Sequence, residues 1–273
     1  MPTLADNLKV WNGLYAWPSE GDEWSEEFGG TEALWWFVVY PRIHRFLPVP
    51  NILEIAPGRG RWTQFLKNQC QSMIAVDISP KCIESCKTRF AGHNHIQFHV
   101  NDGHSLEAVP DNSIDFVFSF DSLVHAEKDV LKDYLFQLAA KLKPNGAGFI
   151  HHSNIGAYPR RLALLNAHRR LPAVLRAHLI KEAHVEAMLS INVQAWRATS
   201  MNAELFRRHC QEAGLRCISQ ELINWHHGKC LIDALSLFTK PNSPWDTKSS
   251  NLENDQFVKG TLLTNRLSRL YCQ

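Results

Sequence analysis

Asn51-Ile-Leu-Glu-Ile-Ala-Pro-Gly-Arg-Gly-Arg-Trp62 is the stretch that decides the fold of this chain. Its apolar half, 52–55, predicts a short strand, and Gly58 and Gly60 predict a tight turn that leads into a helix over 61–68. Glycine permits backbone conformations that other residues resist and lets a ligand come close, while the following helix presents unpaired N–H groups. The stretch therefore predicts a strand, a glycine turn and a helix that form a cradle for a nucleotide-sized ligand.

A carboxylate is predicted beside this turn. The next apolar run, 73–77, predicts a second strand that ends in Asp77, where the side chain is placed to accept hydrogen bonds from both ribose hydroxyls of a bound nucleoside. A dinucleotide-binding Gly-x-Gly-x-x-Gly motif would need a third glycine, but this chain has Thr63 there and carries Glu54 inside the preceding strand. An acid at that place suits a cationic ligand better than a pyrophosphate.

The chain alternates between strand and helix patterns from Asn51 onward. Strands are predicted over 52–56, 73–77, 96–100, 114–120 and 147–152, and helices over 61–68, 80–90 and 127–142. A helix over 203–213 and two β-rich runs, 216–225 and 231–239, predict a closing antiparallel hairpin. This order predicts an α/β fold with a doubly wound, mostly parallel, seven-stranded sheet.

The ordered motifs resemble those of the class I S-adenosylmethionine-dependent methyltransferases. The resemblance rests on Glu54-Ile-Ala-Pro-Gly-Arg-Gly60, Asp77, Asn101-Asp102-Gly103, Phe116-Val-Phe-Ser-Phe-Asp121 and Leu142-Lys-Pro-Asn-Gly146. It implies a Rossmann-like fold, S-adenosylmethionine as the cofactor, and methyl transfer as the activity. It also implies a set of cofactor-binding residues, which are Glu54, Ala56, Gly58, Gly60, Asp77, Ile78, Asn101, Asp102, Gly103 and Asp121.

Some of these assignments have alternatives. Asp102 is expected to accept a hydrogen bond from an adenine amine and Ile78 to pack on the ring, but Asp102 before Gly103 is also typical of an Asx-turn. The glycine turn alone would fit an NAD(P)-dependent oxidoreductase or a binding protein that has kept the fold without the chemistry. The missing third glycine counts against the first alternative, and the presence of Glu54, Gly58 and Asp77 counts against the second.

A single domain over 1–240 is expected, followed by a tail, 241–273, whose role the sequence does not indicate. The first fifty residues are rich in tryptophan. In the family a segment at this place commonly folds over the cofactor, so Tyr15, Trp17 and Trp36 are expected to line the site, with aromatic core packing as the alternative.

Residues 157–195 interrupt the alternation with a basic, helical segment, and their place in the chain predicts a helical cap inserted over the active site. A solvated face or a dimer contact is the expected position of most of its basic side chains.

Transfer of a methyl group to a hydroxyl requires that a base or a metal ion remove the proton. Three places at the expected active edge offer such groups: 121–127, 151–154 and 226–227. Neighbouring residues on a strand point to opposite faces, so only one of His151 and His152 can face a given pocket. The choice falls on His152, which lies nearer the strand tip. Asp121, His152 and His226 are therefore predicted to supply a base with orienting groups, or the ligands of a divalent metal such as Mg²⁺.

Three further stretches indicate the acceptor. Phe120-Asp-Ser-Leu-Val-His-Ala-Glu-Lys-Asp129, Gly148-Phe-Ile-His-His-Ser-Asn154 and Trp196-Arg-Ala-Thr-Ser-Met201 are similar to bacterial sugar O-methyltransferases, some of them metal-assisted. This resemblance implies a hydroxyl of a sugar or glycan as the acceptor. The alternative is N- or O-methylation of another small metabolite, for which a shaped pocket would suffice.

Composition excludes several other classes of function. The net charge of +2 is too mild to indicate nucleic-acid or membrane binding, so a small-molecule or saccharide acceptor is the expected partner, with a homodimer as an option. Seven cysteines without a paired spacing indicate neither a disulfide framework nor a zinc site. The N-terminus lacks a basic segment followed by an apolar one, so a cytoplasmic location is expected.

Overall fold

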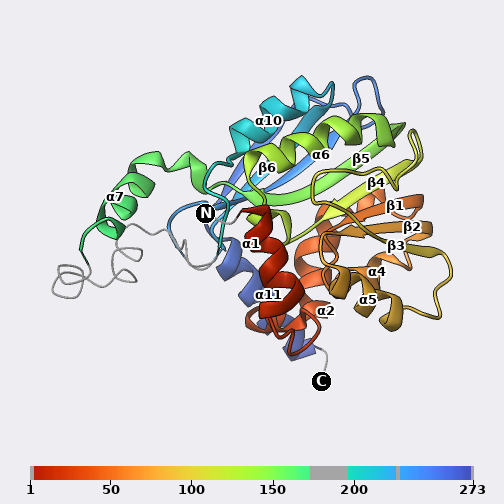
Figure 1. Ribbon diagram of the computed structural model, residues 1–273, viewed down its shortest axis with the longest axis horizontal. Coiled ribbons are helices and arrows are strands. Elements are labelled where there is room, and N and C mark those ends of the chain that lie inside the picture. Colours follow the sequence, from red (N-terminus) through yellow and green to blue (C-terminus); the bar gives the residue numbers. More distant parts are fainter. Residues whose placement is uncertain (1–2, 173–195, 226–227, 272–273) are drawn as a thin grey trace.

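The structure, a computed structural model, describes residues 3–172, 196–225 and 228–271 (Figure 1). Its centre is an eight-stranded sheet with the strand order β3-β2-β1-β4-β5-β7-β6-β8. The strands are β1 (Val49–Ile55), β2 (Cys70–Asp77), β3 (Ile96–Val100), β4 (Ile114–Ser119), β5 (Leu142–Ser153), β6 (Arg216–Ile223), β7 (Asp233–Thr239) and β8 (Ser250–Asn254). Strands β1 to β5 pair in parallel, and β7 runs antiparallel to both β5 and β6. The predicted Rossmann-like α/β fold is confirmed.

The predicted count of seven strands is wrong by one, because β8 extends the sheet beyond β6, to which it is parallel. This strand comes from the stretch Ser250-Asn-Leu-Glu-Asn254, which is mostly polar and exposed and therefore shows no alternation of apolar and polar residues. A helix, α11 (Phe257–Tyr271), follows it. The C-terminal residues thus form a sheet edge and a helix.

Helices cover both faces of the sheet. The main helices are α1 (Leu4–Lys9), α2 (Thr31–Leu34), α3 (Tyr40–Ile43), α4 (Thr63–Leu66), α5 (Pro80–Arg89), α6 (Lys128–Lys141), α7 (Pro159–Arg169) and α10 (Ala203–Glu212). Helices α6 and α10 pack together on one face, over a core that includes Leu131, Leu135 and Phe206. The other face is covered by α4, α5, α11 and the N-terminal turns, over a core that includes Trp35 and Phe118.

Two predicted helices differ from the structure. The helix predicted over 61–68 is a single turn, α4, so the glycine turn is followed by little regular helix. Of the predicted cap, 157–195, the structure describes the start, where α7 projects away from the sheet (Figure 1); residues 173–195 lie outside the described part. Within the described residues, no helix has both the length and the apolar character needed to cross a bilayer.

Candidate active site

A cavity of about 780 Å³ lies where β1, β2 and β4 end. Ala56 and Gly58 line it after β1, Asp77 and Ile78 after β2, and Asp121 after β4. Ligands bind over the carboxyl ends of the strands in open α/β sheets, and pockets for them have volumes of roughly 300–1,000 Å³. The cavity therefore has the place and the size of a ligand site.

Asp77 holds the glycine turn in shape. Its Oδ2 accepts a hydrogen bond from the Gly58 N–H at 3.0 Å, and its Oδ1 accepts one from the Ser79 N–H at 2.8 Å. Each carboxylate oxygen can accept a further hydrogen bond. Burial raises the pKa of Asp77 to about 6, although both backbone hydrogen bonds oppose the shift. Gly58 takes a left-handed conformation at φ 58°, and a Cβ there would lie 2.9 Å from the Trp17 ring.

Two motif residues lie behind the turn, away from the cavity. Alternation along β1 directs Glu54 to the face that α4 covers, where its Oε2 accepts a hydrogen bond from the Thr63 hydroxyl at 2.6 Å. Burial raises the pKa of Glu54 to about 8. Gly60 faces the Phe90 ring, which a Cβ at this position would meet at 2.4 Å. Both residues shape the turn from below, and neither lines the cavity.

The loop after β3 contributes fewer residues to the cavity lining than the sequence predicts. Gly103 lines the cavity, but Asp102 is exposed and its Oδ1 accepts hydrogen bonds from the His104 and Ser105 backbone N–H groups. These bonds lower the pKa of Asp102. The Asn101 amide donates to the Tyr134 hydroxyl at 3.0 Å. Asp102 thus has the geometry of the Asx-turn alternative. It lies outside the cavity lining, which does not match the predicted contact with an adenine amine.

The N-terminal segment forms an aromatic wall. Four of its residues, Trp11, Tyr15, Trp17 and Trp24, line the cavity and pack with ring centroids 5.0–5.9 Å apart. We call these four residues the aromatic cluster. Trp36, which was also expected here, is 49% exposed and packs on Tyr40, outside the cavity lining.

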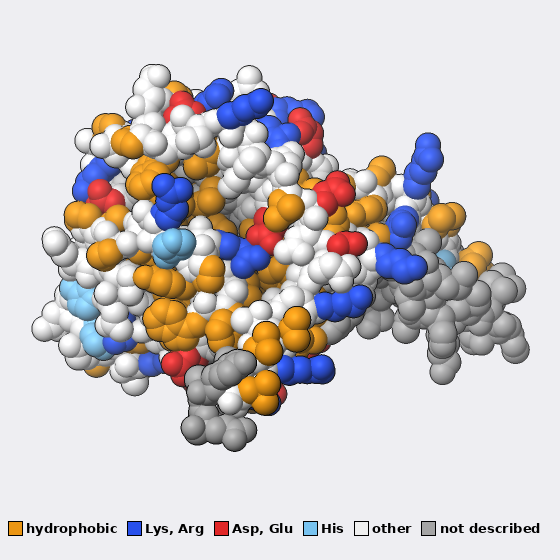
Figure 2. Space-filling view, turned by 180° about the vertical axis from the view of Figure 1, so that it is seen from behind, with side chains coloured by type: hydrophobic (Ala, Val, Ile, Leu, Met, Phe, Trp, Pro, Cys, Tyr) orange, Lys and Arg blue, Asp and Glu red, His pale blue; other side chains and the backbone are white. Residues whose placement is uncertain are grey.

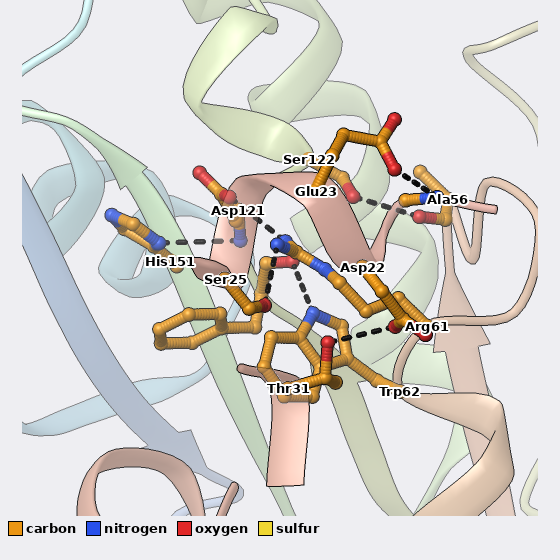
Figure 3. A network of polar contacts seen from close by, with 12 residues as sticks. Asp22, Glu23, Ser25, Thr31, Ala56, Arg61, Trp62, Asp121, Ser122 and His151 are labelled. Atoms are coloured by element: carbon orange, nitrogen blue, oxygen red, sulfur yellow. Dashed lines mark hydrogen bonds and ion pairs between the residues drawn. The ribbon is translucent and has the colours of Figure 1, made fainter. Parts of the chain in front are cut away.

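Charged side chains at the wall of the cavity form a network, part of which Figure 3 shows. Arg61, from the turn after β1, donates to Asp121 Oδ2 at 2.8 Å, and its guanidinium lies over the Trp62 ring at 4.6 Å. Asp121 Oδ1 lies 3.7 Å from Arg197, which donates to Asp233 at 2.8 Å. Burial alone would raise the pKa of Asp121, but Arg61 and Arg197 outweigh it and lower this pKa. The network joins the turns after β1 and β4 to β7.

The histidine pair on β5 is oriented oppositely to the prediction. His152 stacks on Phe206 at 4.3 Å, and its Nε2 lies 2.9 Å from the Ser236 hydroxyl, on the face covered by α10. Burial lowers the pKa of His152 to about 4. His151 points toward the network instead: its Nδ1 accepts a hydrogen bond from the Asp121 N–H at 3.2 Å (Figure 3). His152 is therefore not brought to Asp121, and His226 lies outside the described residues.

The positions of Asp121 and His152 do not fit the predicted metal site. Asp121 and His152 lie on different faces of the sheet region, and Asp121 is already paired with Arg61. Among residues 3–172, 196–225 and 228–271, no group of three or more His, Cys, Asp or Glu side chains is arranged to hold a metal ion.

His125, which lies in the 121–127 stretch, lines the cavity, although the sequence prediction assigned the role of base to His152. Its Nδ1 lies 2.8 Å from the Trp196 carbonyl oxygen, and its ring packs on Trp11 at a centroid distance of 5.3 Å. Burial lowers its pKa to about 4, and Arg197 adds to this effect. Nδ1 must donate to the carbonyl, so Nε2 carries the lone pair. His125 thus has the tautomer of a proton acceptor.

Comparison with known proteins agrees with this geometry. Residues 52–146 match the family model described as a methyltransferase domain. A solved structure, the PH0226 protein of Pyrococcus horikoshii, is 16% identical with a TM-score of 0.53, covering 85% of this chain and 95% of its own. A DhpI–SAH complex is 12% identical with a TM-score of 0.55, covering 88% and 98%. Residues 52–146 therefore resemble a methyltransferase domain, and the two solved structures share the fold of this chain. The domain begins with the strand that precedes the glycine turn and includes Asp77 and Asp121.

Two curated relatives match parts of this chain. The rRNA adenine N-6-methyltransferase of Streptomyces fradiae is 31% identical over 67 residues, which is 24% of this chain and 21% of the relative. The phosphoethanolamine N-methyltransferase of Plasmodium falciparum is 30% identical over 98 residues, which is 35% of this chain and 36% of the relative. The chain thus spans about a third or less of the length of these relatives.

Proposed function

We propose that this protein transfers a methyl group from S-adenosylmethionine to a small acceptor that is enclosed in the cavity. The observation that carries the proposal is the convergence, around one cavity, of the Asp77-braced glycine turn and an imidazole nitrogen with an available lone pair, Nε2 of His125. The matched methyltransferase domain supports it.

The residues around the turn fit the cofactor. Asp77 keeps acceptor capacity on both carboxylate oxygens for ribose hydroxyls, and Ile78 offers an apolar surface for a base. The aromatic cluster presents ring faces and edges to a ligand that carries a sulfonium cation, and aromatic ring faces attract cations. When bound, S-adenosylmethionine supplies an activated methyl group, so the protein has to align the acceptor and remove its proton.

His125 is the residue that we assign to proton removal, in place of His152. The Trp196 carbonyl fixes its tautomer, and its lowered pKa keeps the ring neutral at pH 7. Trp196 itself adopts a left-handed backbone conformation at φ 58°, which turns its carbonyl oxygen toward the ring. With the proton held on Nδ1, the lone pair on Nε2 can take up a proton from an acceptor hydroxyl during transfer.

The acceptor that we propose is a hydroxyl of a sugar or glycan. Half-buried aromatic side chains such as Trp11, Tyr15 and Trp24 offer broad apolar surfaces on which the C–H face of a sugar ring can pack. The cavity volume of about 780 Å³ lies in the upper half of the range for ligand pockets, so an acceptor can lie beside the cofactor.

An amine is the second candidate acceptor. The rim of the cavity carries the carboxylates of Glu23, Glu27 and Asp129 beside the aromatic cluster, and acidic and aromatic groups together suit a cation. The names of both curated relatives describe N-methylation. An amine that binds in its neutral form would not need His125 as a base.

The test is transfer of a labelled methyl group from S-adenosylmethionine to a panel of sugars and a matched panel of small amines, with Mg²⁺ present or chelated. Label on a sugar that depends on His125 would support the leading proposal. Label on amines alone would favour the second candidate. Cofactor binding without transfer to any acceptor of either panel would count against methyl transfer as the activity.

A further inference from the structure

The C-terminal helix α11 contacts the segment that walls the cavity. The buried Asn265 side chain donates from Nδ2 to the Phe28 carbonyl oxygen at 2.9 Å. The neighbouring Gly29 approaches this amide so closely that a Cβ would lie 1.9 Å from Asn265 Nδ2. Phe28 ends the 3₁₀ turn η2 (Asp22–Phe28), which also carries Trp24 of the aromatic cluster. Asn265 thus holds the end of the turn that carries part of the cavity wall.

A second contact joins the start of α11 to the cavity. The ring of Phe257 lies 5.5 Å from that of Trp225, and Trp225 lies 5.1 Å from Phe28. Trp225 and Phe28 both line the cavity, whereas Phe257 does not. Phe257 is 3% exposed, so these three rings form a packed row from the helix to the cavity wall.

The helix itself is anchored to the sheet edge. Asn254, at the end of β8, donates to Glu221 Oε1 at 2.7 Å, and the same carboxylate accepts two hydrogen bonds from Arg42 at 2.6 and 2.7 Å. The Arg42 guanidinium lies 5.4 Å from the centre of the Phe257 ring. The added strand β8 and this ion pair therefore fix the point from which α11 departs.

We propose that α11 is a brace for the cofactor site, and that Asn265 and Phe257 are positioning residues that hold η2 in place without touching the ligand. The inference rests on the proposed function in so far as the ligand is S-adenosylmethionine. It gives the C-terminal residues a role in ligand binding that the cavity lining alone does not reveal.

The docking of α11 is expected to strengthen the binding of the cofactor. If η2 needs α11 to keep its place, then loosening α11 reduces the fraction of molecules in which the cavity is formed, and the apparent affinity for the cofactor falls by that fraction. Loss of one buried hydrogen bond is therefore expected to weaken binding by up to about tenfold. By reciprocity, the bound cofactor stabilises the docked position of α11.

The experiment compares Asn265→Ala with Thr264→Ala in the full chain. Thr264 is exposed on the same helix and its hydroxyl bonds only to the Gly260 carbonyl oxygen, so it is a matched control. The first readout is hydrogen exchange of residues 22–30 without cofactor, well below the unfolding temperature. The brace predicts faster exchange there in Asn265→Ala and no change in Thr264→Ala. Equal exchange in both variants would overturn it.

The second readout is the dissociation constant of S-adenosylmethionine, measured by calorimetry at the same temperature. The positioning role predicts weaker binding for Asn265→Ala, by up to about tenfold, and unchanged binding for Thr264→Ala. Unchanged binding in both variants would contradict the role, because that result is expected if the helix merely stabilises the fold. Failure of the unsubstituted chain to bind would instead contradict the proposed function, and the exchange readout would then decide on the brace alone.

Discussion

Nδ1 of His125 lies 2.8 Å from the carbonyl oxygen of Trp196. A carbonyl can only accept, so Nδ1 carries the proton and Nε2 keeps its lone pair. Within the described residues, the hydrogen bond of the His125 ring is this one, at Nδ1. The pair therefore fixes an imidazole in the form that a general base needs, at the wall of the cavity that the glycine turn borders.

Replacing His125 by Asn should slow methyl transfer to a hydroxyl by about 10²- to 10⁴-fold, the usual contribution of a positioned base. Binding of S-adenosylmethionine should change little. His44→Asn is the control, since His44 is exposed and lies outside the cavity lining. Single-turnover rates and calorimetry measure the two effects, and an unchanged rate would show that the acceptor is already nucleophilic.

The pH dependence of the rate should report the lowered pKa of this imidazole. A histidine with a pKa of about 4 loses its lone pair only when the pH falls toward that value. The turnover rate at saturating cofactor should therefore be retained through pH 6 to 7 and should fall near pH 4 to 5, with circular dichroism showing that the fold persists. A loss of rate centred at the ordinary value of 6.5 would contradict the assignment.

Asp77→Asn should weaken cofactor binding by at least tenfold. The carboxylate accepts hydrogen bonds from the Gly58 and Ser79 N–H groups, and an amide would turn a donor toward one of them. Asp111→Asn, on an exposed loop, is the control for a change of one charge. Calorimetric titration with S-adenosylmethionine measures the difference, and equal affinities for the two variants would argue against a ligand over this turn.

Glu54 should make the protein less stable as the pH rises. Burial raises its pKa from the ordinary 4.5 to about 8, so the folded state holds a proton that the unfolded state releases. This contribution to stability is complete below pH 4.5 and is lost as the pH rises through 8. Glu54→Gln should remove that part of the pH dependence and should stabilise the protein at pH 8 by up to a few kcal/mol. Urea unfolding at several pH values tests this, and identical pH profiles would contradict it.

Most of the fold was predictable because local sequence patterns mark its strands and its glycine turn. The apolar runs, the glycine turn and Asp77 identify β1, β2 and the ligand edge without knowledge of any distant contact. The polar strand β8 was not predictable, because an exposed edge strand needs no alternation of apolar residues. Its pairing with β6 depends on backbone hydrogen bonds, to which every residue contributes alike.

The site was only partly predictable, because side-chain direction depends on register. The sequence shows that His151 and His152 face opposite ways, but the choice between them follows from the packing of α10 on β5 and β7, which places Phe206 against His152. His125 was visible as a candidate, yet its tautomer depends on the carbonyl of Trp196, far along the chain. Long-range contacts of this kind leave no local pattern.

Titration of the full chain with S-adenosylmethionine, beside NAD⁺ under the same conditions, distinguishes a methyltransferase site from a dinucleotide site. We expect saturable binding of S-adenosylmethionine at one site per chain, weakened in Asp77→Asn, and no comparable binding of NAD⁺. Absence of S-adenosylmethionine binding by the folded protein, or preferential binding of NAD⁺, would contradict it.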